Sequence, residues 1–209
     1  MPDKDLLNNI KKLRELTGVG FKDCKLAIDE NNGDIEKSIE FLRKKGIAKA
    51  TKKMSRTASE GLVLVKEKNG EISIIEINSE TDFVAKNKDF ISFCKEIADI
   101  CFEQKGNLNQ INSTNMKNNI SVKNNLIDLI SKIGEKVTIR RAKYIDAKDG
   151  KNFYYVHGSI EKYIGKIVSI VKLTPNKDTE ELGGKLAMHI AATNPLSIDE
   201  QGMDKNILD

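Results

Sequence analysis

Residues 78–84 place an acid and a large aromatic side by side, between a segment of strand character and a segment of helical character. Two interpretations of this junction are open. Thr81 or Asp82 could accept a backbone N–H at the start of the helix, with Phe83 folded inward as the first core residue. Alternatively, Phe83 could be an exposed wedge that enters a pocket on a partner, with the negative charge of Asp82 beside it. Both interpretations describe positioning or binding, and neither describes a reaction.

No arrangement of nucleophile, general base or metal ligands stands out elsewhere. The two histidines, His157 and His189, have neither metal-ligand nor catalytic-triad spacing. The three cysteines include no CxxC pair, which fits a reducing compartment and supports neither a disulfide framework nor a zinc site. Cys94 and Cys101 are seven residues apart, so we expect them in the core on one helical face. The sequence therefore predicts no catalytic residue, no metal site and no cofactor.

A glycine pair also fails as a nucleotide-binding signature. Gly18 and Gly20 flank a single valine after a helical segment, whereas phosphate-binding loops follow a strand. The segment also lacks a third glycine and the Lys-Ser/Thr pair of a Walker motif. We expect a turn between two helices here.

The composition excludes several classes of protein. The 209 residues are 39% hydrophobic and 32% charged, which is typical of a folded domain. No apolar run approaches the roughly 18 residues that a membrane-spanning helix needs. The polar residues 1–5 do not resemble a signal peptide, so we expect a cytoplasmic location and no membrane partner. The net charge of +4 is modest and most of the 35 basic residues are lysine, which argues against a dedicated nucleic-acid binder.

Residues 1–46 have the apolar spacing of three short helices. The first apolar stripe ends at Gly18, and residues 21–30 follow as the second helix. Asp34 is expected to cap a third helix that ends at Gly46. A bundle of this size has too little core for chemistry, so we predict a docking module.

A basic segment follows this module. Residues 44–56 carry six positive charges and no acid. The simplest interpretation is a solvated linker, which we place at residues 47–58. Contact with an acidic partner or with RNA is the alternative.

Strand character begins after residue 58. Asn69-Gly70 predicts a tight hairpin turn, because both central residues of such a turn need positive φ. Residues 104–125 are rich in asparagine, so we expect a flexible connection there. The helix that follows this connection is expected to stop at Gly134. The remaining expected elements are strands over 62–65, 72–77, 137–145, 153–156 and 167–173, and helices over 83–102, 126–133 and 178–193.

An internal repeat divides the core. Residues 71–78 have a counterpart 96 residues later in 167–174, and a strand precedes and a helix follows each copy. We predict an α+β fold with two related subdomains of antiparallel sheet and helices, over residues 59–148 and 149–209. Only the first copy has a further helix and strand to complete its sheet. The second is expected to be incomplete, with an open sheet edge that could pair with a second copy in a dimer.

Several short segments resemble the translation elongation factor Ts family, and they occur in the family's order with compatible spacing. Each segment alone is weak evidence, but together they span nearly the whole chain and make the resemblance specific. They are LRELTGVGFKDCK at 13–25, TDFVA at 81–85, IGE at 133–135, IRR at 139–141 and AMHIAA at 187–192.

The resemblance implies a guanine nucleotide exchange factor, not an enzyme, that binds the GDP-bound form of elongation factor Tu. It also implies that residues 1–46 form a ubiquitin-associated-like (UBA-like) module. In the family, the TDFV loop dislodges the magnesium ion at the nucleotide site of the GTPase. That role is carried over to Thr81, Asp82, Phe83 and Val84.

Further positions match family contacts to the partner. In the helical module these are Arg14 and Lys25, and in the core they are Ile133, Gly134 and His189. Many relatives have a methionine pair after the Gly-x-Gly turn, where this chain has Phe21-Lys22. Many also continue into a coiled-coil hairpin and a C-terminal module, so the resemblance is to a shortened form.

Three hypotheses from other classes compete with the exchange factor. A UBA-type adaptor would bind through the module without affecting nucleotides. An RNA-binding protein would use residues 44–56, with a steep dependence of affinity on salt. A hydrolase would need a nucleophile and base arrangement, which the sequence does not suggest.

Overall fold

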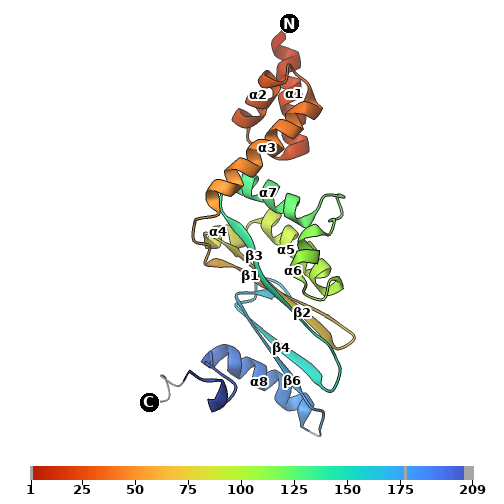
Figure 1. Cartoon of the computed structure of the whole chain (residues 1–209), viewed down its shortest axis with the longest axis vertical. Helices are drawn as coiled ribbons and strands as arrows, with labels where there is room; N and C mark the ends of the chain where they lie inside the picture. The colour runs from red at the N-terminus through yellow and green to blue at the C-terminus, as the bar shows by residue number, and fades with distance from the viewer. Residues whose placement is uncertain (1, 177, 205–209) are drawn as a thin grey trace.

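The computed structural model describes residues 2–176 and 178–204. Figure 1 shows an elongated molecule with three parts along its length: a helical module, a sheet covered by helices, and a smaller sheet with one helix. All paired strands within the described residues are antiparallel. The predicted α+β class is therefore confirmed. No helix in the described part of the chain combines the length and apolarity that crossing a membrane requires.

The helical module has a small core of its own. Its helices are α1 (Pro2–Thr17), α2 (Phe21–Glu30) and α3 (Ile35–Lys53). Asp34 caps α3 as predicted, because its carboxylate accepts a hydrogen bond from the backbone N–H of Lys37 at 3.0 Å. The buried side chains of this core are Ile10, Leu13, Cys24, Ala27, Ile28 and Leu42.

The predicted end of the third helix at Gly46 is wrong. Helix α3 continues to Lys53, so the first part of the predicted linker is helical. Gly46 is buried beside α7 (Val122–Ile133), and a Cβ there would lie 3.4 Å from Oγ of Ser131. Gly46 therefore lies within the contact between α3 and α7, and the helix continues past it. Figure 1 shows α3 leading from the module to the side of α7.

The main sheet has the order β3-β2-β1-β5, so β2 lies between two long neighbours. Asn69 and Gly70 have φ values of 55° and 78°, which confirms the predicted hairpin turn. The two-residue strand β5 was not predicted, because it is too short for a sequence pattern. The strands are β1 (Glu60–Lys68), β2 (Glu71–Ser79), β3 (Val137–Ile145) and β5 (Ile164–Gly165).

The β2–β3 pairing contains a bulge. Ile77 lies opposite Ile139, whereas Glu76 lies opposite Arg141, so Arg140 is an extra residue on β3. Arg140 and Arg141 both donate hydrogen bonds to the carboxylate of Glu76. Burial raises the pKa of Glu76, but hydrogen bonds from Arg141, Asn78 and Arg140 outweigh this effect and hold its pKa below the usual value. The bulge is thus anchored by a buried, ionised carboxylate.

The helix predicted over residues 83–102 is two helices. Helix α4 (Asp82–Ala85) is a single turn, and α5 (Lys88–Glu103) begins after a break. The side chain of Asn87 accepts hydrogen bonds from two backbone N–H groups of the first turn of α5, so it caps a new helix. Cys94 and Cys101 are buried on α5, as predicted.

The asparagine-rich segment is folded, so the prediction of a flexible connection over residues 104–125 is wrong. It contains α6 (Leu108–Ser113), which Asn107 caps with its side-chain oxygen. Ile111 and Met116 are buried in the core that α5 and the sheet form. Asparagine here supplies caps and turns around a few apolar anchors, which composition alone does not reveal.

The second half of the core contains a two-stranded sheet and a helix. Strands β4 (Lys151–His157) and β6 (Ile167–Leu173) pair with each other, and α8 (Thr179–Thr193) packs against both. As predicted, β6 pairs with no third strand among residues 2–176 and 178–204. A 3₁₀ turn (Glu200–Gly202) follows α8.

Close packing of α8 on β4 depends on one glycine. A Cβ at Gly183 would lie 2.2 Å from Cγ of Phe153, whereas a Cβ at Gly184 would meet nothing within 4 Å. We expect Gly183→Ala to lower the free energy of unfolding by about 1–3 kcal/mol through overpacking. The control Gly184→Ala should be neutral or stabilise by up to about 1 kcal/mol, because alanine is the better helix former. Urea unfolding followed by circular dichroism measures both, and equal stability of the two variants would contradict the packing.

Candidate functional site

Phe83 points out of the molecule. Its side chain is 79% exposed, so the interpretation of Phe83 as an inward core residue is wrong. The next two residues, Val84 and Ala85, are 5% and 2% exposed and belong to the main core. Single exposed apolar side chains are common on protein surfaces. The exposure of Phe83 is notable because hydrogen bonds to the neighbouring residues fix the loop that carries it.

Thr81 is held by a distant carboxylate. Its backbone N–H donates to Oε2 of Glu135 at 3.0 Å, and its hydroxyl lies 2.9 and 3.1 Å from the two carboxylate oxygens of Glu135. The carbonyl of Thr81 accepts a hydrogen bond from the Ser79 hydroxyl at 2.9 Å. The side chain of Thr81 makes no cap hydrogen bond to α4, so its interpretation as a helix cap is wrong.

Glu80 makes the reciprocal contact. Its carboxylate accepts a hydrogen bond from the backbone N–H of Lys136 and lies 3.3 Å from Nη1 of Arg56. The hydrogen bond from Lys136 lowers the pKa of the Glu80 carboxyl, and the positive charges of Arg56 and Lys53 lower it further. The ammonium group of Lys136 donates to the carbonyls of Met54 and Arg56, at 2.8 Å each. The segment after α3 is therefore tied to the same corner.

The strand register explains why these segments meet. Ser79 lies opposite Val137 at the end of the β2–β3 pairing. The same register, continued two residues beyond the sheet, places Thr81 beside Glu135. If the Glu76–Arg141 register continued without a bulge, Thr81 would lie opposite Lys136 and not opposite Glu135.

Asp82 supplies a negative charge next to the exposed ring. Its carboxylate lies 3.0 Å from the ammonium group of Lys86, one helical turn later. This hydrogen bond lowers the pKa of Asp82, so the carboxylate is ionised at neutral pH.

Ile133 and Gly134 lie in the turn that pairs with the loop. Ile133 packs against the main core, and Gly134 ends α7 with a φ of 86°, as predicted for a glycine stop. The carbonyl of Gly134 accepts a hydrogen bond from the Lys53 ammonium group. The structure therefore brings residues 133–134 next to the loop of residues 81–84.

The other predicted positions are spread along the molecule. Arg14 and Lys25 are exposed on α1 and α2, and Lys25 pairs with Asp29 at 3.5 Å. A Cβ at Gly18 would lie 3.0 Å from Cε of Lys132, so the module turn reaches the end of α7. His189 is exposed on α8, which lies at the opposite end of the molecule from the module in Figure 1. These residues do not line one pocket.

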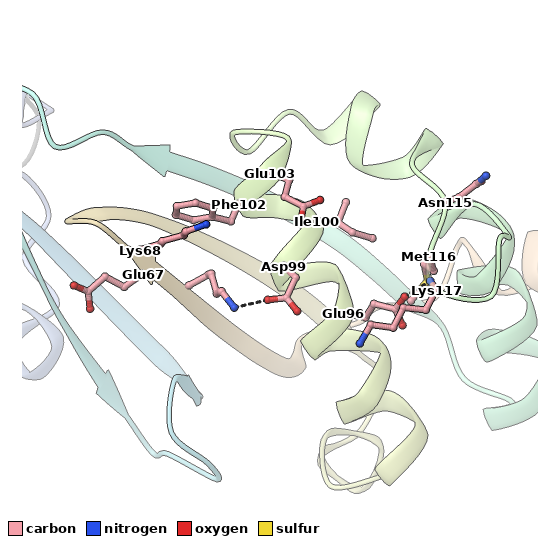
Figure 2. Close-up of a pocket in the computed structure, with 11 residues that line it drawn as sticks. Glu67, Lys68, Glu96, Asp99, Ile100, Phe102, Glu103, Asn115, Met116 and Lys117 are labelled. Atoms are coloured by element: carbon pink, nitrogen blue, oxygen red, sulfur yellow. Dashed lines mark hydrogen bonds and ion pairs between the residues drawn. The ribbon is translucent and has the colours of Figure 1, made fainter.

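A groove of about 770 Å³ lies elsewhere, between β1, α5 and residues 115–117. Figure 2 shows charged side chains along it. The ammonium group of Lys66, which also lines the groove, lies 2.6 Å from the carboxylate of Asp99. The groove includes none of the predicted site residues. Across residues 2–176 and 178–204, no group of three or more His, Cys, Asp or Glu side chains could hold a metal ion.

Four residues that hold the loop were not among the predicted site residues. They interact across about 24 to 82 positions of sequence, and such long-range contacts have no periodic signal in a single chain. Two of the four stood within segments that the sequence analysis singled out: Glu80 in residues 78–84 and Glu135 in the motif at 133–135. The four residues are Arg56, Glu80, Glu135 and Lys136.

The fold and site define an α+β protein that presents an exposed aromatic side chain on a hydrogen-bonded loop, with a helical module at one end. Comparison with known proteins identifies the family. The model of the family described as Elongation factor TS matches residues 80–209. The chain belongs to the elongation factor Ts family, which confirms the resemblance found in the sequence.

Curated relatives in that family match over nearly the whole chain. The chain is 42% identical to Elongation factor Ts of Methylorubrum extorquens (strain PA1) over 204 residues, which are 96% of this chain and 67% of the relative. It is 43% identical to Elongation factor Ts of Methylobacterium sp. (strain 4-46) over 199 residues, 93% of this chain and 65% of the relative. The chain spans about two thirds of the length of these relatives.

Stability measurements test whether Phe83 serves the fold. We expect Phe83→Ala to change the free energy of unfolding by at most about 0.5 kcal/mol, because the ring is mostly exposed. The control Phe90→Ala removes a fully buried ring nearby and should cost about 3–5 kcal/mol. A large loss of stability in Phe83→Ala, measured by urea unfolding, would show that the ring packs inward in solution.

Proposed function

We propose that the chain is a guanine nucleotide exchange factor in translation elongation. It binds GDP-bound elongation factor Tu, dislodges the magnesium ion of that GTPase and promotes GDP release, so that GTP can rebind. The observation that supports this most directly is the 79% exposed ring of Phe83 on a loop held by Glu80 and Glu135. Membership in the elongation factor Ts family supplies the partner.

The TDFV loop acts as the wedge in this proposal. Phe83 enters a pocket of the GTPase near its nucleotide site, and Asp82 brings an ionised carboxylate with it. On the N-terminal side of Phe83, Thr81 is held by its hydrogen bond to Glu135. On the C-terminal side, Val84 is held by its packing in the core. Magnesium holds nucleotide phosphates strongly, so its displacement weakens GDP binding. In this proposal the chain acts as a binding protein and not as an enzyme.

Thermodynamic linkage makes the effects of GDP and of the chain on each other's binding reciprocal. If the chain weakens GDP binding by some factor, GDP weakens binding of the chain by the same factor. GTP can therefore complete the cycle by expelling the chain from the partner. No cofactor of the chain itself is needed.

Further contacts to the partner are proposed along the molecule. Ile133 and Gly134 adjoin the wedge, Arg14 and Lys25 extend the surface over the module, and His189 contacts the partner near its nucleotide-binding end. Their exposure or their place beside the loop is compatible with one long docking surface. In this proposal residues 1–46 are a UBA-like module, 47–58 a linker, and 59–148 and 149–209 the two related subdomains.

An RNA-binding function has less support, and we propose no direct nucleic-acid contact. Most of the positive charges between residues 44 and 56 have partners within the chain, which lowers their availability to phosphates. Helix α3 accounts for most of these contacts. The paired residues are Lys44 with Glu40, Lys45 and Lys49 with Asp23, Lys53 with the Gly134 carbonyl, and Arg56 with Glu80.

Stopped-flow release of a fluorescent GDP from elongation factor Tu tests the proposal at fixed magnesium concentration. The wild-type chain should accelerate release, and the acceleration should weaken as magnesium rises. Phe83→Ala should reduce it about tenfold to a hundredfold, as expected for a central aromatic anchor. Arg14→Ala and His189→Ala should weaken complex formation.

A matched control removes another exposed apolar side chain. Ile198 is fully exposed and carries no proposed contact, so Ile198→Ala should leave exchange unchanged. A folded wild-type chain that neither binds the GTPase nor accelerates GDP release would refute the exchange function. If the isolated module of residues 1–46 bound as tightly as the full chain, the adaptor hypothesis would be favoured.

We also propose a dimer through the open edge of β6. The counterpart strand β2 is paired on both edges, whereas β6 pairs only with β4 among the described strands, so one row of backbone groups is available for pairing. Sedimentation equilibrium should give twice the chain mass of 23.4 kDa at high protein concentration. A monomer across the whole concentration range would contradict the dimer and leave the exchange function untouched.

A further inference from the structure

We propose that Glu135 and Glu80 are positioning residues for nucleotide exchange: together they hold the Phe83 loop against the Gly134 turn. We call this pair the carboxylate clasp. The inference rests on the proposed function, because it assigns the clasp a role in presenting the wedge to the GTPase.

The clasp is reciprocal. Glu135 accepts hydrogen bonds from the N–H and hydroxyl of Thr81, and Glu80 accepts one from the N–H of Lys136. Each segment thus donates a backbone N–H to a carboxylate of the other. Hydrogen bonds to ionised carboxylates are among the stronger ones in proteins. Arg56 adds a positive charge 3.3 Å from Glu80, which extends the clasp to the segment after α3.

Helix α4 cannot fix Phe83 without help. It is a single turn of four residues with no side-chain cap, and one isolated turn is unstable in water. After Phe83, the buried side chain of Val84 anchors the backbone to the core. Before Phe83, the clasp anchors the backbone through Thr81. A wedge fixed in this way loses less conformational freedom when it enters a partner.

The core itself does not depend on the clasp. Glu80 and Glu135 lie beyond the ends of β2 and β3, and the flanking residues Val84 and Val137 are buried among apolar side chains. We therefore expect Glu135→Ala to fold. Glu135→Gln keeps one acceptor oxygen and is the conservative variant.

The control variant must remove a similar hydrogen bond, from a backbone N–H to a carboxylate, in another part of the chain. Glu96 on α5 accepts a hydrogen bond from the backbone N–H of Lys117, so it also joins two segments through a carboxylate. It lines the groove of Figure 2, which includes none of the site residues. Glu96→Ala should therefore leave the loop and exchange unchanged.

Loop mobility can be measured without the partner. The chain contains no tryptophan, so Phe83→Trp introduces a single fluorophore at the tip of the loop. In that background, Glu135→Ala should lower the steady-state fluorescence anisotropy, Glu135→Gln should lower it less, and Glu96→Ala should not change it. Unchanged anisotropy in Glu135→Ala would overturn the positioning role.

Exchange kinetics then test the consequence in the chain that retains Phe83. At saturating concentrations of the chain, Glu135→Ala should slow GDP release from elongation factor Tu about tenfold, with partial recovery in Glu135→Gln. A general loss of folding would instead reduce the active fraction and leave the saturating rate unchanged. Wild-type exchange rates in both Glu135 variants would refute the role in exchange. Failure of the wild type itself would refute the proposed function, while the anisotropy would still decide whether the clasp holds the loop.

Discussion

Strand β2 is paired along both of its edges, and most of its residues are buried. A strand in this position can shift only if both neighbours shift with it, since every displaced backbone group would lose a hydrogen bond. Its last residue, Ser79, is therefore fixed opposite Val137. The loop that follows β2 and the turn that precedes β3 emerge together, and the location of Phe83 is a consequence of this pairing.

The bulge at Arg140 adjusts the pairing by one residue. A bulge leaves one residue without its regular cross-strand hydrogen bonds. Here the hydrogen bonds from Arg140 and Arg141 to the buried carboxylate of Glu76 offset that loss. Glu76 is buried at the point in the sheet where the register changes. The bulge thus decides whether Glu135 or Lys136 lies opposite Thr81, several residues away.

Helix α3 joins the module to the same corner. Its packing at Gly46 brings it against α7, and Lys53 at its end reaches the carbonyl of Gly134. In the other direction, the ammonium group of Lys136 donates hydrogen bonds to the carbonyls of Met54 and Arg56. The module, the end of α7 and the loop after β2 therefore meet through hydrogen bonds to backbone groups.

Sequence alone determined several local features of this protein, but not the end of α3, the break between α4 and α5, or the fold of residues 104–125. The hairpin at Asn69-Gly70, the cap at Asp34, the helix stop at Gly134 and the unpaired edge of β6 all follow from backbone preferences or from a repeat. The exposure of Phe83 stayed open, because the same residues suit a helix start or a wedge. Only the tertiary structure decided that Phe83 is exposed, that Gly46 lies inside a helix contact, and that Thr81 pairs with Glu135. These depend on contacts between distant segments, which single-chain periodicity does not encode.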